Sequence, residues 1–180
     1  MLDDLLAFLH ASPTPFHAVA EARRRLDAAG FRALTEAEPW DALPPGAYHV
    51  TTSDTNLLAF VVPADAAARR QFHIVGAHTD SPTLKVKPHP DTGAVGWQQV
   101  AIEVYGGALV NSWLDRDLGL AGRVAVRHDD GLRTHLLHVD RPLLRVPQLA
   151  IHLDRDVATS GLKLNPQQHL TPVWGLGTPT

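Results

Sequence analysis

The pattern of the sequence changes near Pro82. Before this proline, stretches with apolar residues at helical spacing are followed by short, continuous apolar runs. After it, short segments of alternating apolar and polar residues are separated by glycine, proline and aspartate. Continuous apolar runs are typical of buried strands, whereas alternation is typical of antiparallel sheets. The chain is therefore predicted to combine an α/β part with a β-rich part that follows it.

Two helices are predicted at the N-terminus. Residues 2–10 carry apolar positions at helical spacing, and a polar, proline-containing segment interrupts them. A second helix is predicted to begin with Thr14 as its cap and Pro15 in its first turn, and to end at Gly30. Threonine before proline at the start, and glycine at the end, are typical helix boundaries.

Three strands are predicted before Pro82. A short strand at residues 48–50 is followed by two apolar runs, at residues 57–62 and 72–77. Turn-forming or charged residues bound each run, which suits strands of a sheet that is covered on both faces. Periodicity alone leaves a buried helix open for the two runs.

Composition limits the chemistry that the chain can perform. It contains no cysteine, which excludes a disulfide scaffold, a thiol nucleophile and a thiolate zinc site. It contains 11 histidines in 180 residues, so imidazole and carboxylate groups would hold any transition metal. The formal net charge of -3 argues against a broad basic surface for nucleic acid.

No targeting or membrane-spanning segment is expected. Asp3 and Asp4 lie where a signal peptide needs positive charge. No apolar run approaches the roughly 20 residues needed to span a bilayer. We therefore expect a cytoplasmic protein with neither a membrane nor a nucleic-acid partner.

The segment after residues 72–77 is the most informative one. It presents His78 and Asp80 at the carboxyl end of a predicted strand, where ligands bind in open α/β sheets. Residues two apart in an extended chain point to the same side. One could bind a metal while the other holds an imidazole or a base in place. The alternative is a hydrogen-bonded loop histidine followed by an aspartate that caps a turn.

Four segments in a fixed order carry a family resemblance. They are SPTPFHAVAEARRRLDAAGF, HTDSPTLKVKP, VYGGALVNSWLDRDLGLAGRV and VPQLAIHLDRDV. Together they resemble the aspartyl aminopeptidase family of zinc metallopeptidases, and they cover nearly the whole chain. Four ordered matches are far more specific than any one short motif.

The resemblance implies a fold and an activity. It implies an α/β catalytic domain, interrupted by an inserted β-rich domain that mediates dimerisation. Residues 1–82 would be the N-terminal part of the catalytic domain, residues 83–172 the insertion, and residues 173–180 a truncated tail returning to the catalytic domain. It further implies a cytosolic aminopeptidase that removes N-terminal, mainly acidic, residues from peptides. Two zinc ions per active site and self-association into dimers or larger assemblies complete the expectation.

The resemblance also assigns roles to single residues. His78 matches a zinc ligand, and Asp80 matches the aspartate of the active site that orients a ligand. His152 matches a position that is treated either as a further zinc ligand or as a residue of the inserted domain that reaches the neighbouring subunit's active site. The alternative places His152 on one face of a strand, where it pairs with its neighbour.

Asp115 and Asp117 also invite a metal interpretation, because paired carboxylates can bridge two ions. We favour a structural role, since an Asp-Arg-Asp segment is also typical of a solvated, salt-bridged turn. In the family that the chain resembles, the bridging aspartate lies further along than Thr180.

The remaining parts of such a site are not expected in these residues. In the family, the bridging carboxylate and the general base follow the inserted domain, and no Glu-Glu pair occurs here. The 180 residues alone are therefore expected to bind zinc weakly and to hydrolyse nothing measurable. Two other functions stay open, namely a non-catalytic oligomerisation module and a related metal-dependent N-deacylase.

Overall fold

The computed structural model describes residues 1–65 and 72–178. The chain divides into two compact units, and each contains two stretches of sequence. The first unit comprises Met1–Asp80 and Ala121–Leu137, and the second comprises Ser81–Leu120 and His138–Thr180. Among the described residues, no helix is both long enough and apolar enough to cross a bilayer.

The first unit begins with the two predicted helices, α1 (Leu2–Ala11) and α2 (Pro15–Ala28). Thr14 caps α2, because its side chain accepts a hydrogen bond from the backbone N–H of His17 at 3.4 Å. Gly30, with φ of +83°, takes the left-handed conformation that ends many helices. Local sequence signals therefore predicted both boundaries of α2 to within two residues.

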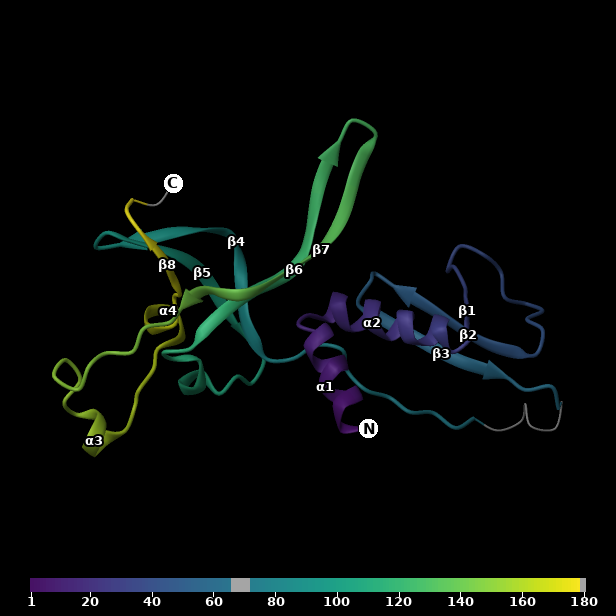
Figure 1. Cartoon of the computed structure of the whole chain (residues 1–180), viewed down its shortest axis with the longest axis horizontal. Coiled ribbons are helices and arrows are strands. Elements are labelled where there is room, and N and C mark those ends of the chain that lie inside the picture. The colour runs from purple at the N-terminus through teal and green to yellow at the C-terminus, as the bar shows by residue number, and fades with distance from the viewer. Residues whose placement is uncertain (66–71, 179–180) are drawn as a thin grey trace. The chain divides into compact units, whose positions relative to one another are not determined.

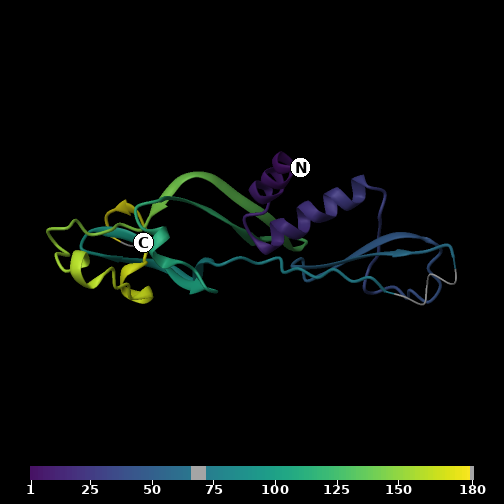
Figure 2. The ribbon, with the colours of Figure 1, turned by 90° about the horizontal axis from the view of Figure 1, so that it is seen from below.

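A three-stranded sheet follows, in the order β1-β2-β3. Its strands are β1 (Arg32–Ala33), β2 (Gly46–Thr52) and β3 (Asn56–Val62). β2 and β3 form an antiparallel hairpin, and α2 lies against it (Figure 2). Leu58 and Val61 are 56% and 65% exposed, so the expectation of a sheet covered on both faces is wrong for this hairpin.

The core of the first unit joins α2 to β2. Val19, Tyr48 and Val50 are buried there. His49 is buried beside them, and its Nε2 lies 2.7 Å from Asp27 Oδ1 on α2. This pair joins the helix to the strand through a polar contact.

Residues 72–77 do not form the predicted strand. They follow an extended path without regular secondary structure (Figure 1). Phe72, Ile74 and Val75 are 85%, 87% and 99% exposed. Within the described residues no strand pairs with this segment, and a strand is stable only when neighbours complete its hydrogen bonds. The prediction of a buried strand here is therefore wrong for the structure of these residues.

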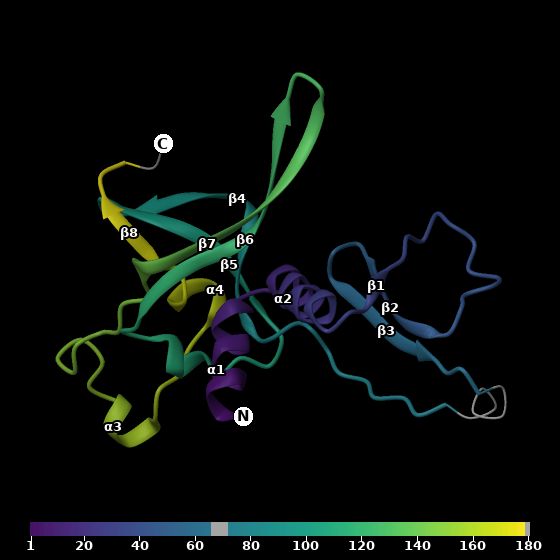
Figure 3. The same ribbon diagram turned by 45° about the vertical axis from the view of Figure 1, so that its right-hand side comes forward.

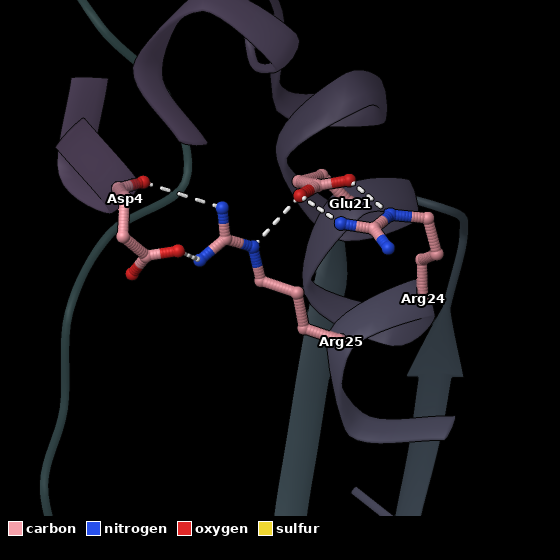
Figure 4. Close-up of polar contacts among 4 residues, drawn as sticks. All are labelled: Asp4, Glu21, Arg24 and Arg25. Atoms are coloured by element: carbon pink, nitrogen blue, oxygen red, sulfur yellow. Dashed lines mark hydrogen bonds and ion pairs between the residues drawn. The ribbon is translucent and has the colours of Figure 1, made fainter. Parts of the chain in front are cut away.

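Glu21 connects the two helices through a network of ion pairs (Figure 4). It accepts hydrogen bonds of 2.7 Å from Arg24 and from Arg25. Arg25 also donates to the carboxylate of Asp4 on α1 at 2.7 Å. The bonds from Arg24 and then Arg25 lower the pKa of Glu21 from its ordinary value of 4.5 to about 2.

Acid is expected to weaken the first unit through Glu21. A carboxyl group whose pKa is lower in the folded state stabilises the fold above pH 4.5 and loses this effect as the pH falls toward about 2. Because Arg24 is 67% exposed, water screens the network, and we expect a loss of no more than about 1 kcal/mol. Urea unfolding between about pH 5 and pH 2.5 should show this loss in the natural sequence and not in Glu21→Gln. Glu38→Gln, at an exposed position, is the matched control and should keep the natural pH dependence.

The second unit contains most of a five-stranded sheet, in the order β4-β5-β8-β7-β6 (Figure 3). Its strands are β4 (Thr83–Ala94), β5 (Trp97–Tyr105), β6 (Asp117–His128), β7 (Gly131–Arg145) and β8 (Val173–Leu176). The short helices are η2 (Val110–Trp113), α3 (Val157–Ser160) and α4 (Pro166–His169). β4 pairs with β5, and β8 with β5 and β7, in antiparallel fashion, as the alternating pattern predicted.

The core of the second unit combines residues of its strands with residues of the segments that connect them. Ile102 of β5 and Leu114 pack with Val146 and Leu170, and the last two are fully buried. Val146 and Leu170 lie in the long connection between β7 and β8. This connection is therefore part of the core despite its lack of long elements.

Two segments near the C-terminus differ from the sequence-based expectation. Residues 149–155, expected to be a strand of the alternating type, form turns and irregular structure instead. Residues 173–176, expected in a tail outside the β-rich part, form β8 inside its sheet. So short an alternating segment forms a strand only where it can pair with the edge strand of a sheet.

Candidate functional site

His78 and Asp80 form a local pair at the end of the first unit. The ring nitrogen Nδ1 of His78 lies 2.7 Å from the backbone oxygen of Asp80 and 3.1 Å from its Oδ1. Because both oxygens are acceptors, Nδ1 carries the hydrogen and donates. With Nδ1 as the donor, Nε2 is the ring nitrogen that could bind a metal.

The pair lies at the surface of the first unit. The side chains of His78 and Asp80 are 81% and 41% exposed. Among residues 1–65 and 72–178, no three histidine, aspartate or glutamate side chains come together as a metal-binding group. The described residues therefore offer a metal one imidazole with an oriented ring, and not a full ligand set.

Thr79 attaches this segment to the β2–β3 hairpin. Its Oγ1 donates a hydrogen bond to the backbone oxygen of Thr55 at 2.8 Å. Thr55 follows the hairpin turn, in which Ser53 and Asp54 both have positive φ values of 54° and 58°. Both residues are therefore in the left-handed region, and the N–H of Thr55 closes the turn by donating to the oxygen of Thr52 at 3.2 Å.

His152 lies in the second unit, in the turn after Ala150. The backbone N–H of Leu153 donates to the oxygen of Ala150 at 2.8 Å, and His152 is exposed. The alternative that placed His152 on one face of a strand is therefore wrong. His78 and His152 belong to different units of the chain.

Asp115 and Asp117 make structural contacts. Asp115 has a φ of 51°, and its Oδ1 accepts a hydrogen bond from the backbone N–H of Gln148 at 3.2 Å. Asp117 pairs with Arg145 at 2.9 Å. These contacts hold the chain around η2 to the end of β7, in agreement with the structural role favoured from the sequence.

Comparison with known proteins identifies the family. The model of the family described as "Aminopeptidase I zinc metalloprotease (M18)" matches residues 8–180. The chain belongs to the M18 aminopeptidase family. The resemblance read from the sequence is therefore confirmed.

M18 relatives match in sequence and in structure. A probable M18 family aminopeptidase 2 of Streptomyces coelicolor is 63% identical over 175 residues, which cover 97% of this chain and 39% of that protein. The cryo-EM structure of the Ape4 and Nbr1 complex aligns with a TM-score of 0.88 and 41% identity, over 96% of this chain and 33% of that one. The S. cerevisiae mApe1 dodecamer aligns with a TM-score of 0.79 and 27% identity, over 98% of this chain and 38% of that one. The chain thus spans about 39% of the length of its curated M18 relatives.

The described residues fit part of an M18 zinc site. The family description names zinc, and Nδ1 of His78 is held by Asp80, which leaves Nε2 as the ring nitrogen that could bind a metal. Metal-binding histidines usually make such a bond to a carboxylate or a backbone carbonyl. His78 could supply one ligand, and no group of three or more potential ligands occurs in the described part of the chain.

Sequence reasoning missed the contact between Thr79 and Thr55 in this M18 chain. Ser53 and Asp54, between two apolar runs, are residues that favour a turn. No local pattern indicates which distant segment a turn will contact. Thr55 and Thr79 are 24 positions apart, which places this contact beyond the reach of sequence periodicity.

Proposed function

We propose that the whole protein to which these residues belong is a zinc aminopeptidase that removes N-terminal, mainly acidic, residues from peptides in the cytoplasm. The observation that carries the proposal is the pair of His78 and Asp80, with Nδ1 donating to Asp80 and Nε2 left in its metal-binding form. Membership of the M18 family supports the same reading.

In this proposal the chain's own residues have distinct roles. His78 holds one zinc ion through Nε2, and Asp80 fixes the tautomer and the direction of the ring. Zinc, two ions per active site in this proposal, would polarise the scissile carbonyl and lower the pKa of a bound water. The remaining ligands and the general base would come from the part of the M18 length that this chain does not span. The 180 residues alone are accordingly proposed to bind zinc weakly and to be inactive.

His152 is proposed to act near the metal. It is an exposed residue of a turn in the β-rich unit, which suits a contact with a site outside that unit. Either it binds zinc in its own subunit or it completes the active site of a neighbouring one. We also propose that the protein self-associates as a dimer or a larger assembly, since one structural relative is described as a dodecamer.

Substrate profiling of the whole protein tests the proposal. Peptides with free N-terminal aspartate or glutamate should be hydrolysed faster than those with neutral residues, and N-acylated amino acids should not react. Chelation should abolish the activity, and added zinc should restore it. Hydrolysis of N-acyl substrates alone would instead indicate an N-deacylase. Stable assembly without zinc and without hydrolysis would indicate an oligomerisation module. Strong turnover by the 180 residues alone would contradict the proposal that the remaining ligands and the general base lie outside them.

A further inference from the structure

We propose that Thr79 is a positioning residue for the metal ligand His78. Its hydroxyl anchors the segment that carries His78 to the turn between β2 and β3. This inference rests on the proposed function, because it concerns how the chain directs its imidazole toward zinc.

The segment depends on such an anchor because it has no regular secondary structure of its own. Residues 72–80 contain no helix and no strand, and residues 72–78 are exposed. The bond between His78 and Asp80 is local, so it orients the ring relative to its own loop and not relative to the fold. Thr79, which is partly buried, makes a contact that joins this loop to a distant element, at 2.8 Å.

The acceptor of this bond belongs to a well-defined element. Thr55 closes the turn between β2 and β3, and its N–H donates to the oxygen of Thr52 at 3.2 Å. From that point β2 and β3 pair in continuous register, from Thr52 with Asn56 to Gly46 with Val62. The carbonyl that receives the Thr79 hydroxyl is therefore fixed by the whole hairpin.

A second contact also holds this turn. Asp54 accepts a hydrogen bond from Arg123 of β6 at 2.9 Å. The guanidinium of Arg123 lies over the ring of Phe16 on α2, 4.3 Å from its centroid. A cavity of about 140 Å³ lies beside these three residues. Since Asp54 and Arg123 are 58% and 33% exposed, this pair supports the turn and does not replace the Thr79 bond.

The geometry defines what the Thr79 side chain must supply. A backbone carbonyl only accepts, so the hydroxyl acts as donor, and serine can do the same. Valine has nearly the same shape and lacks the donor. If Thr79 only fills space, Thr79→Val should preserve its role. If Thr79 positions the segment through its hydroxyl, Thr79→Ser should preserve the role and Thr79→Val should not.

Zinc affinity of the whole protein tests the inference, measured by competition with a chromogenic chelator. Thr79→Val should weaken zinc binding about 10- to 100-fold, which is typical of residues that orient a ligand from outside the metal's own shell. Thr79→Ser should bind zinc nearly as the natural protein does. Thr134→Val, an exposed threonine of the same unit, is the matched control and should leave the affinity unchanged. The thermal midpoint of each metal-free variant shows whether it is folded, and Thr79→Ala repeats the test if valine is not accommodated.

The outcomes separate this inference from the proposed function. Natural zinc affinity in Thr79→Val, or an equal loss in the valine and serine variants, would overturn the positioning role alone. A natural protein that binds no zinc at all would overturn the proposed function, and the inference with it. Loss of affinity in the valine variant with recovery in the serine variant would establish both.

Discussion

Replacing His78 with alanine in the whole protein is expected to remove stoichiometric zinc and to lower aminopeptidase activity by at least about 100-fold. Loss of an outer partner of a metal ligand already costs up to about 100-fold in affinity, and this change removes the ligand itself. Because the side chain is 81% exposed, the substitution leaves no buried gap, and the fold should keep its stability. Elemental analysis of zinc, a peptidase assay and a thermal melt on the same preparation measure the three effects.

His73 provides the matched control for this experiment. It is an exposed histidine of the same extended segment, five positions before His78. His73→Ala should keep zinc and activity. Full zinc content in His78→Ala, or an equal loss in the two variants, would contradict the role of His78.

Asp80→Asn should have a smaller effect than His78→Ala. The backbone oxygen of Asp80, at 2.7 Å, still accepts the hydrogen of His78 Nδ1 when the carboxylate is gone. The zinc affinity of this variant should therefore lie between those of the natural protein and His78→Ala. An effect as large as that of the alanine variant would show that Asp80 does more than orient the ring.

Replacing Gly119 with alanine is expected to destabilise the second unit by about 3 kcal/mol, at the upper end of the usual cost of overpacking. A Cβ at Gly119 of β6 would lie 2.5 Å from the backbone oxygen of Val139 in β7. Two strands would have to separate to relieve this contact, because the obstacle is backbone and not a flexible side chain. Sequence analysis assigned no role to Gly119.

Gly122 is the control within the same strand. A Cβ there meets no atom within 4 Å, so Gly122→Ala should leave the stability of the fold nearly unchanged. Guanidinium unfolding followed by tryptophan fluorescence reports mainly the second unit, which contains Trp97, Trp113 and Trp174. A midpoint in Gly119→Ala equal to that in Gly122→Ala would show that β6 and β7 separate at little cost.

Local signals explain which elements were predictable. The cap at Thr14, the stop at Gly30 and the apolar run of β3 act within a few residues, so they appear in the sequence and again in the structure. The alternating segments after Pro82 predicted β4 to β7 for the same reason. The run at residues 72–77 has an equally strong pattern, but a strand also needs partners, and the described residues supply none.

In the candidate site, too, some contacts follow from the local sequence and others depend on distant residues. Residues two apart in an extended chain lie on one side, so the closeness of His78 and Asp80 follows from their spacing alone. The order of the four matching segments likewise pointed to the M18 family without any coordinates. These properties belong to the sequence, because they depend on spacing and on the identity of neighbouring residues.

Only the tertiary structure decided how that site is held. In the tertiary structure, Thr79 bonds to the turn that follows Thr52, and Arg123 bonds to Asp54. Residues 173–176 pair within the sheet as β8. Each of these contacts joins segments that are distant along the chain. Their partners are selected by the free energy of the packed fold, and no local pattern of residues encodes that choice.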